Sequence, residues 1–204
     1  MRDFLQIFGP LLGSIAVVPY VYDVIRGRTK PNIVSWSTWA LLTGIGTAAI
    51  IAGGDFRSSL LPLNSTICTI VVVILAIKFG FAKYTRLDKF CQLGAIVGLL
   101  LWFIFDAPLV ALVITIIIDL LASIPTYNHA WKAPGEETWE TFAIASVGAF
   151  LTLLAVKASA ITMVYPIYLM LLDGGIAIIT VYRRKQKGIS LRREGKIETV
   201  HEDI

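Results

Sequence analysis

The chain has 204 residues, of which 56% are hydrophobic and only 16% are charged, whereas an ordinary soluble domain has about 25% charged residues. Long uncharged apolar segments exceed the usual length of core strands and helices, so the composition excludes an ordinary soluble domain and predicts an integral protein of the lipid bilayer. The net charge of +4 follows from the loops described below and requires no nucleic acid as a partner.

Seven apolar segments follow one another, and each is expected to form one transmembrane helix. Backbone groups in lipid must be satisfied internally, and segments without period-two alternation favour helices over a closed barrel. The first segment lacks the small-residue cleavage site of a signal peptide and is too long for its apolar region. The segments are residues 4–25, 33–53, 60–81, 90–105, 108–127, 141–156 and 159–182.

The distribution of Lys and Arg predicts the orientation of these helices. With the N-terminus outside and the C-terminus in the cytoplasm, 15 of the 18 Lys and Arg residues fall on the cytoplasmic side, as the positive-inside rule requires. Residues 184–204 then form a basic cytoplasmic tail. We expect a multi-pass protein of a prokaryotic cell membrane.

The first segment carries Pro19 and is followed by a basic loop, residues 26–32, that leads into the second segment. A proline inside a span creates a kink point, because it frees a backbone carbonyl. In the second segment, Trp36 is expected at the membrane interface. Trp39 lies about one turn deeper and is a candidate for stacking on a ligand, with Thr43 on the same face.

A weaker copy of this pattern begins about a hundred residues later, at Pro125. When Pro125 is matched to Pro19 and Trp139 to Trp36, the equivalents of Trp39 and Thr43 are Phe142 and Ser146. The fourth segment, rich in aliphatic residues and glycine, then returns the chain so that a second three-helix unit starts on the same side as the first, which makes the repeats parallel. The predicted units are residues 1–84, a linker helix in residues 85–106, and residues 107–183.

Buried polar residues are the candidates for function in the remaining segments. Asn64 in the third segment matches Tyr168 in the seventh, and an amide there either joins helices or binds a solute. Asp119 in the fifth segment and Asp173 in the seventh are expected inside the membrane, where a carboxylate is a functional hypothesis by default. The alternative for each aspartate is a protonated, structural hydrogen bond. Gly174 and Gly175 permit close helix approach or local unwinding.

This arrangement, with a proline in the first helix of each triplet and a basic loop into a Ser/Trp-bearing second helix, resembles the PQ-loop superfamily. That group includes the SWEET sugar transporters, lysosomal cystine and cationic amino acid exporters and, more distantly, the KDEL receptors. The Pro-Gln dipeptide is replaced by Pro19-Tyr20 and Pro125-Thr126. The resemblance implies an all-α membrane fold of seven helices in a 3+1+3 arrangement, with Pro19 and Pro125 as hinges.

These features predict a secondary transporter or facilitator of a small polar solute, of the sugar or amino-acid class, that alternates access between the two three-helix units. Proton coupling is one option. The predicted substrate-binding residues are Trp39, Thr43, Asn64, Phe142, Ser146 and Tyr168, and the predicted proton-coupling residues are Asp119 and Asp173.

Two alternatives remain open. A receptor or sorting module of the same fold would bind a peptide or lipid without net transport and should lose function when residues 183–204 are removed. An accessory subunit would use the fourth segment as its contact surface. The sequence contains no HExxH, GxSxG or phosphate-loop motif and no disulfide or metal spacing around Cys68 and Cys91, so we expect no enzyme, metal or cofactor. A homo-oligomer is left open.

Overall fold

The computed structural model describes residues 2–52, 56–80, 85–104, 108–155 and 160–191, and within these ranges it contains helices and no strand. Part of the predicted tail, residues 192–204, lies outside the described residues. The helices are α1 (Arg2–Ile15), α2 (Val17–Ile25), α3 (Ile33–Ala52), α4 (Phe56–Phe79), α5 (Arg86–Ile104), α6 (Pro108–Lys132), the 3-10 turn η1 (Pro134–Glu136), α7 (Trp139–Ala155) and α8 (Ala160–Gln186).

Three stretches within the described residues are long and apolar enough to cross a membrane, namely Ile7–Ile25, Val113–Lys132 and Met163–Gln186. Shorter apolar helical stretches lie at Ile33–Ile45, Leu63–Phe79 and Trp139–Ala155. For the described residues, this confirms the prediction of a helical chain with segments long and apolar enough to span a membrane.

The first apolar segment is divided into α1 and α2 at Ala16, three residues before Pro19. Proline removes a backbone donor and its ring crowds the carbonyl four residues earlier, which is that of Ile15. The break therefore falls where the sequence predicts a kink. Pro125, by contrast, lies inside a continuous α6.

A glycine just after the end of α2 terminates this helix at the start of the first loop. Gly27 has φ = 69°, a conformation that glycine adopts without a steric cost. Its N–H donates to the carbonyl of Val24 at 3.0 Å, and the N–H of Arg28 donates to the carbonyl of Asp23 at 2.8 Å. This is a Schellman motif, and it turns the chain sharply out of α2.

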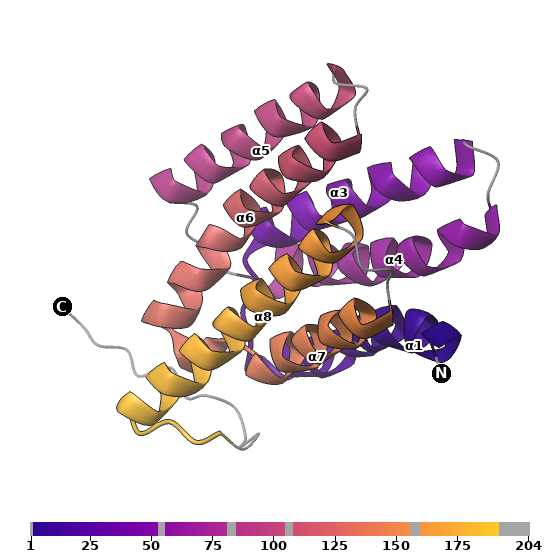
Figure 1. Cartoon of the computed structure of the whole chain (residues 1–204). Helices are drawn as coiled ribbons and strands as arrows, with labels where there is room; N and C mark the ends of the chain where they lie inside the picture. The colour runs from indigo at the N-terminus through magenta and orange to yellow at the C-terminus, as the bar shows by residue number, and fades with distance from the viewer. Residues whose placement is uncertain (1, 53–55, 81–84, 105–107, 156–159, 192–204) are drawn as a thin grey trace.

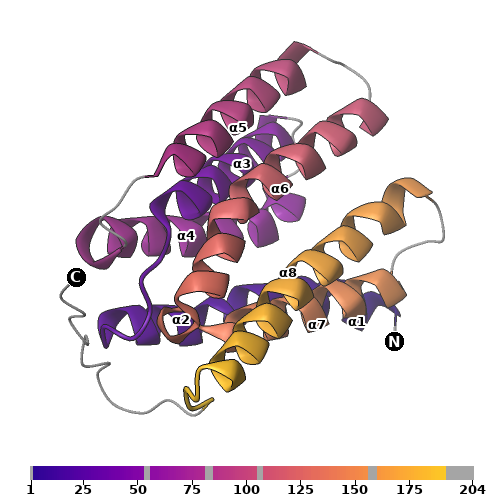
Figure 2. The same cartoon turned by 90° about the vertical axis from the view of Figure 1, so that its left-hand side faces the viewer.

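The helices pack in the same order in both parts of the chain (Figures 1 and 2). In the first half, α1 and α2 pack on α4, which packs along α3; in the second half, α6 packs on α8, which packs along α7. The two halves meet through α1 with α7 and through α3 with α6, while α5 lies along α6.

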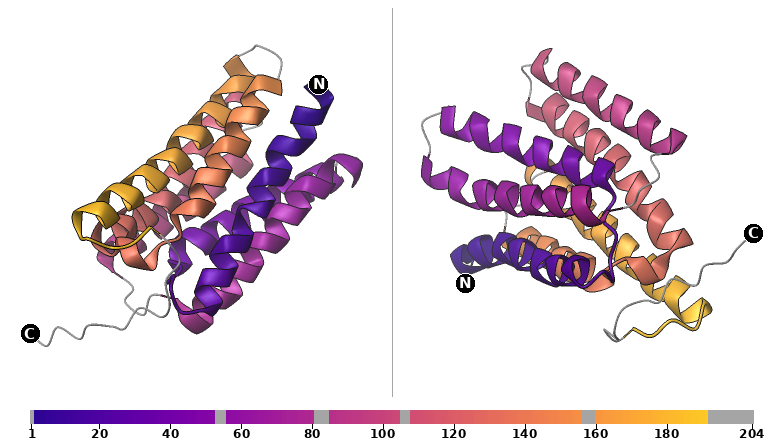
Figure 3. Two further views of the ribbon diagram at one scale, coloured as in Figure 1. Left: turned by 90° about the horizontal axis from the view of Figure 1, so that it is seen from below. Right: turned by 180° about the vertical axis from the view of Figure 1, so that it is seen from behind.

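The contact between α1 and α7 brings two backbones together (Figure 3). A Cβ atom added to Gly148 would lie 2.7 Å from the Gly9 carbonyl oxygen and 3.3 Å from the Gly13 nitrogen. A Cβ added to Gly9 would lie 2.8 Å from the Gly148 carbonyl oxygen. Small residues permit such close crossings between helices in membranes.

The loops carrying residues 26–32 and 133–138 and the last turn of α8 lie at one end of the molecule, and the start of α1 lies at the opposite end (Figure 2). We call the end that carries these loops the loop end. A buried cluster that includes Tyr20, Trp36 and Phe142 fills the core beside it. Trp36, which the sequence predicts at the membrane interface, packs inside the protein: it is 4% exposed, and its indole N–H donates to the Tyr20 hydroxyl at 3.1 Å.

Candidate functional site

A hydrogen bond between Trp39 and Asp119 links the two halves of the molecule. The indole Nε1 of Trp39, on α3, donates to Asp119 Oδ1, on α6, at 2.6 Å. Asp119 is buried, and Trp39 is half-buried with its ring packed edge-on against Trp36 at 5.1 Å. Closer to the loop end, the Thr126 hydroxyl donates to the Ser35 hydroxyl at 2.8 Å. The polar face of α6 therefore faces α3.

The second aspartate lies close enough to the first for the two carboxyl groups to interact electrostatically. Asp173 on α8 is within electrostatic range of Asp119, and the hydroxyl groups of Tyr165 and Tyr168 are within range of both. The two tyrosine rings lie 6.2 Å apart. Among the described residues, the Tyr168 hydroxyl oxygen is buried and forms no hydrogen bond. We call Trp39, Asp119, Tyr165, Tyr168 and Asp173 the central polar cluster.

The glycine pair after Asp173 permits close packing, and α8 continues through it without a break. A Cβ atom on Gly175 would collide with the Tyr127 hydroxyl, which donates to the Leu172 carbonyl at 2.6 Å. A Cβ on Gly174 would lie 3.1 Å from the Ser146 hydroxyl. The two glycines thus let side chains from α6 and α7 approach the α8 backbone beside Asp173.

Gly175→Ala is expected to destabilise the protein by about 1–2 kcal/mol, because the Tyr127 hydroxyl must leave the Leu172 carbonyl and so loses its hydrogen-bond acceptor. The matched test is the Tyr127→Phe, Gly175→Ala pair in a double-mutant cycle of thermal unfolding. Since Phe lacks the colliding oxygen, Gly175→Ala should cost less in the Tyr127→Phe background. Equal costs in both backgrounds would contradict this origin of the effect.

Two of the predicted substrate-binding hydroxyls join neighbouring helices in an equivalent way. Thr43 Oγ1 donates to the Trp39 carbonyl at 2.9 Å and lies 3.5 Å from the Thr69 hydroxyl of α4. Ser146 Oγ donates to the Met170 carbonyl of α8 at 2.9 Å. The matched residues therefore connect neighbouring helices, α3 to α4 in the first half and α7 to α8 in the second.

The other predicted site residues occupy different surroundings. Phe142 is 3% exposed, and its ring packs edge-on against Tyr20 at 6.2 Å. Asn64 is half-buried on α4, and none of the hydrogen bonds between described residues involves it. Tyr168 belongs to the central polar cluster, whereas no hydrogen bond joins it to Asn64 in the part of the chain that the structure describes. Pro19 is half-buried and Pro125 is buried.

At the loop end, polar contacts join the two halves a second time. Lys30 pairs with Glu136 both through its side chain, at 2.5 Å, and through its backbone N–H, which donates to the Glu136 carbonyl at 3.0 Å. The Thr29 and Thr138 hydroxyls are hydrogen-bonded to each other, and Thr138 also donates to Asp23 Oδ2 at 3.1 Å. We call Asp23, Thr29, Lys30, Glu136 and Thr138 the loop clasp.

The start of α3 is fixed to the start of α5 at the same end. Asn32 Oδ1 accepts the N–H groups of Val34 and Ser35, which caps α3. The Asn32 amide donates to Asp88 Oδ1 at 3.3 Å. Asp88 also accepts the N–H of Thr85 at 2.7 Å, and the Thr85 hydroxyl accepts the N–H of Asp88 at 3.2 Å. This reciprocal capping explains why α5 begins before the apolar segment that starts at residue 90.

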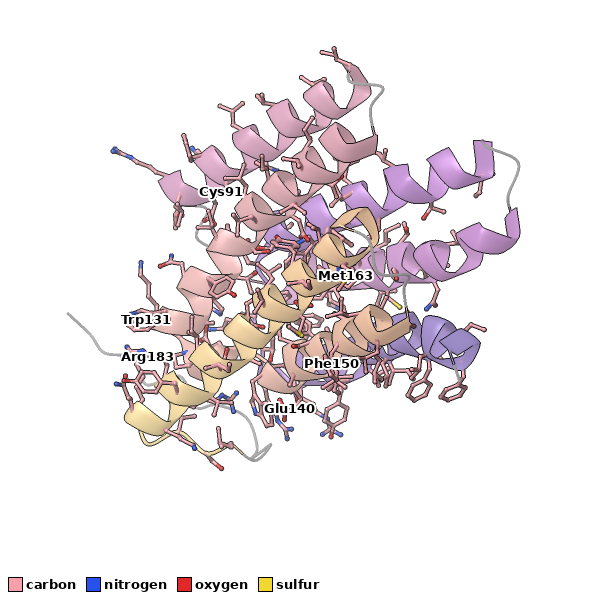
Figure 4. All side chains as sticks on the ribbon, viewed as in Figure 1. Cys91, Trp131, Glu140, Phe150, Met163 and Arg183 are labelled. Carbon is pink, nitrogen blue, oxygen red and sulfur yellow. The ribbon has the colours of Figure 1, made fainter. Side chains whose placement is uncertain are left out.

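Arg184 of α8 holds the backbone of the second loop. Its guanidinium donates to the carbonyls of Pro134 at 2.8 Å, Glu137 at 3.0 Å and Gly135 at 3.4 Å. Its neighbour Arg183 makes a more exposed contact, with its guanidinium 4.5 Å from the centre of the Trp131 ring (Figure 4). Arg184 is therefore the residue that fixes the loop and Arg183 is not.

Glu137, between Glu136 and Thr138 of the loop clasp, is fully buried. Burial raises the pKa of its carboxyl from 4.5 to about 8. The Tyr20 hydroxyl, the Thr138 N–H and Arg184 each lower this pKa by less, and the neighbouring Glu136 raises it. The carboxyl therefore takes up a proton near neutral pH when the loop clasp is closed.

In the described part of the chain, no group of three or more His, Cys, Asp or Glu side chains is placed to hold a metal ion. Cys68 and Cys91 are both free thiols. Comparisons of the chain with models of protein families, with curated proteins and with solved structures found no match.

The sequence pointed to Asp119, Asp173, Trp39 and Tyr168, and the structure brings these four together. The sequence did not indicate Tyr165 or the residues that surround Glu137. Tyr165 lies three residues before Tyr168, so both lie on nearly the same face of one helix. This spacing could have identified Tyr165 as a neighbour of the predicted site. Nothing in the spacing of Glu137, Tyr20 and Arg184 indicates that they meet, because they come from three distant segments.

Proposed function

We propose that the chain is a secondary transporter or facilitator of a small polar solute and that it spans the membrane with seven helices. The observation that carries this proposal is the central polar cluster, in which two aspartates on α6 and α8 lie within electrostatic range of each other, away from both helix ends. No salt bridge between described residues involves either aspartate. Carboxylates held within membrane helices without a basic partner mark solute or proton pathways.

The packing order of the helices supports two parallel three-helix units connected by α5. In each half the third helix lies between the other two, and the contacts between the halves pair the first helix of one unit with the second helix of the other. Such repeats place the solute site at the interface between the units. The central polar cluster occupies this interface, since Trp39 belongs to the first unit and the other four residues to the second.

The Trp39–Asp119 hydrogen bond gives this arrangement a way to respond to a proton. A bond from an N–H group to an ionised carboxylate is short and about twice as strong as a neutral one, and this one is 2.6 Å long. A proton on Asp119 would weaken it and so loosen α3 from α6. Bending at Pro19 and Pro125 would then allow the two units to change their relative tilt.

Asp119→Asn and Asp173→Asn are each expected to reduce solute flux driven by a pH gradient by about tenfold or more. The loss of one charged hydrogen-bonding group in a buried site is worth about 1.5–3 kcal/mol, and each 1.4 kcal/mol is tenfold. The measurement is uptake of sugars and amino acids into proteoliposomes with and without a pH gradient.

Ser123→Ala is the matched control, because the Ser123 hydroxyl lies one turn from Asp119 on the same helix and donates to that residue's backbone carbonyl at 2.7 Å. This variant should keep both the flux and its response to pH. Unchanged flux in both aspartate variants would remove the proposed role of the central polar cluster in coupling. No flux of any tested solute in the unaltered protein would count against the transporter itself.

A further inference from the structure

The loop clasp joins the two halves of the molecule at the end where the basic loops lie. Its bonds connect residues 23–30, from the first half, with residues 136–138, from the second. Two of these partners are themselves fixed: Asp23 lies 3.7 Å from Arg28, and the loop after α6 is held by Arg184. Any motion that separates the halves at this end must break the loop clasp.

Glu137 lies between two residues of the loop clasp, Glu136 and Thr138, and it is fully buried. Burying an ionised carboxylate is costly unless a cation bonds to it. Arg184 interacts with Glu137 electrostatically, but the hydrogen bonds of its guanidinium go to backbone carbonyls, those of Pro134, Gly135, Glu137 and Ser190. The closed loop clasp therefore favours the protonated acid, and the ionised form favours a state in which water reaches residue 137.

We propose that the loop clasp closes this end of the solute pathway, and that Glu137 is a proton-binding site whose deprotonation opens it. The part of this inference that concerns a solute pathway rests on the proposed transport function. The proton site at Glu137 does not depend on it. On opening, the carboxylic proton passes to water and the carboxylate becomes hydrated. Glu137 would thus be a third proton site, separate from Asp119 and Asp173 and located at the gate.

The sign of the pH dependence follows from the two states of Glu137. Its pKa is about 8 in the closed form and returns toward the ordinary value near 4.5 when the loop is hydrated. The closed form is therefore most favoured below pH 4.5 and loses stability as the pH rises to about 8, above which the effect of this group is complete. Within that window the ratio of open to closed forms increases about tenfold per pH unit.

The groups facing Glu137 come from three elements: Tyr20 from α2, Arg184 from α8 and Glu136 from η1. The carboxylates of the loop clasp itself pair with cations, Asp23 with Arg28 and Glu136 with Lys30, and Glu136 also lies 3.8 Å from His129. Each of these two carboxylates thus has a cation beside it, whereas the hydrogen bonds of Arg184 go to backbone carbonyls. A substitution at Glu136 therefore serves as the comparison for one at Glu137.

The test measures the distance across the loop clasp by double electron–electron resonance on the full chain in lipid nanodiscs. Spin labels are attached at Arg26→Cys and Lys132→Cys, in a Cys68→Ala, Cys91→Ala background. Arg26 and Lys132 are exposed at the loop end, and neither side chain takes part in the loop clasp. Spectra are compared at about pH 6, inside this window, and at about pH 9, above it, an interval over which the ratio of open to closed forms should increase about a hundredfold.

With Glu137 intact, we expect one short distance at the lower pH and a longer population at the higher pH. Glu137→Gln should show the short distance at both values, because the amide cannot ionise. Glu136→Gln is the matched control: it weakens the pair with Lys30 but should keep the transition. An identical transition in Glu137→Gln, or none in the protein that retains Glu137, would overturn the proposal.

These distances are recorded without any solute, so they do not depend on the identification of a substrate. A pH transition that requires Glu137 in a protein without solute flux would support the proton site and count against transport. Flux together with distances that do not respond to pH would support transport and reject the proton-controlled loop clasp.

Discussion

Gly148→Ala is expected to destabilise the protein by about 3 kcal/mol, at the upper end of the usual range for overpacking, because the added Cβ meets backbone and not a flexible side chain. The obstacle is the Gly9 carbonyl oxygen at 2.7 Å, and α1 cannot move away from α7 without separating the two halves. At about 2–4 °C per kcal/mol for a chain of this size, the midpoint of thermal unfolding should fall by about 6–12 °C. Circular dichroism in detergent micelles measures this directly.

Gly13→Ala is the control for that prediction. Gly13 also lies on α1 near the crossing, but a Cβ atom there meets no atom within 4 Å. Its replacement should leave the midpoint unchanged or raise it slightly, since alanine favours the helix more than glycine does. Equal losses from both substitutions would show that the close approach of Gly9 and Gly148 does not determine the effect.

Arg184→Ala is expected to cost about 3 kcal/mol or more, since it removes charged donors from three backbone carbonyls of one loop. Without those bonds, residues 134–138 should exchange their amide hydrogens faster, and the loop clasp should weaken with them. Hydrogen–deuterium exchange of this loop, together with thermal unfolding, measures both effects.

Arg183→Ala provides the comparison. Arg183 donates to the Trp131 carbonyl at 3.0 Å and to Gln186, but these contacts are exposed, and exposed polar contacts contribute little to stability. Its loss should change the unfolding midpoint by a small fraction of the Arg184 effect. If the two variants behaved alike, the buried contacts of Arg184 would not be what holds the loop.

Much of the fold could be predicted because its signals are local. The Pro31-Asn32 entry into the second segment, the caps and the apolar lengths lie within a few residues of the elements they define, and α3 begins at Ile33 as expected. The surroundings of Trp36 depend instead on Tyr20, sixteen residues away. A tryptophan near a helix end has the same local pattern whether it faces lipid or core, so its burial could not be read from the sequence.

The candidate site was predictable in part for the same reason. A mid-segment carboxylate is conspicuous in an apolar sequence, so Asp119 and Asp173 could be identified singly, but their mutual proximity depends on how α6 packs on α8. The role of Arg184 was hidden within a basic cluster that also serves as a topology signal. Removal of residues 183–204, a test that the sequence suggests for a receptor, would remove this structural arginine as well. A truncation should instead begin after Leu191.

Two of the helix–helix contacts between the halves, α1 with α7 and α3 with α6, differ in chemistry, and that difference determines how the halves can move. Along α1 and α7, backbone meets backbone at Gly9 and Gly148, with no long side chain between them. Along α3 and α6, separate hydrogen bonds at Trp39 and Ser35 accompany the packing of Ile118 against Leu42 and Ile45. A close backbone contact without long side chains can serve as an axis of rotation. Separate hydrogen bonds, by contrast, are either formed or broken. The halves should therefore rotate about the α1–α7 line, with small displacements beside it and the largest ones across α3 and α6.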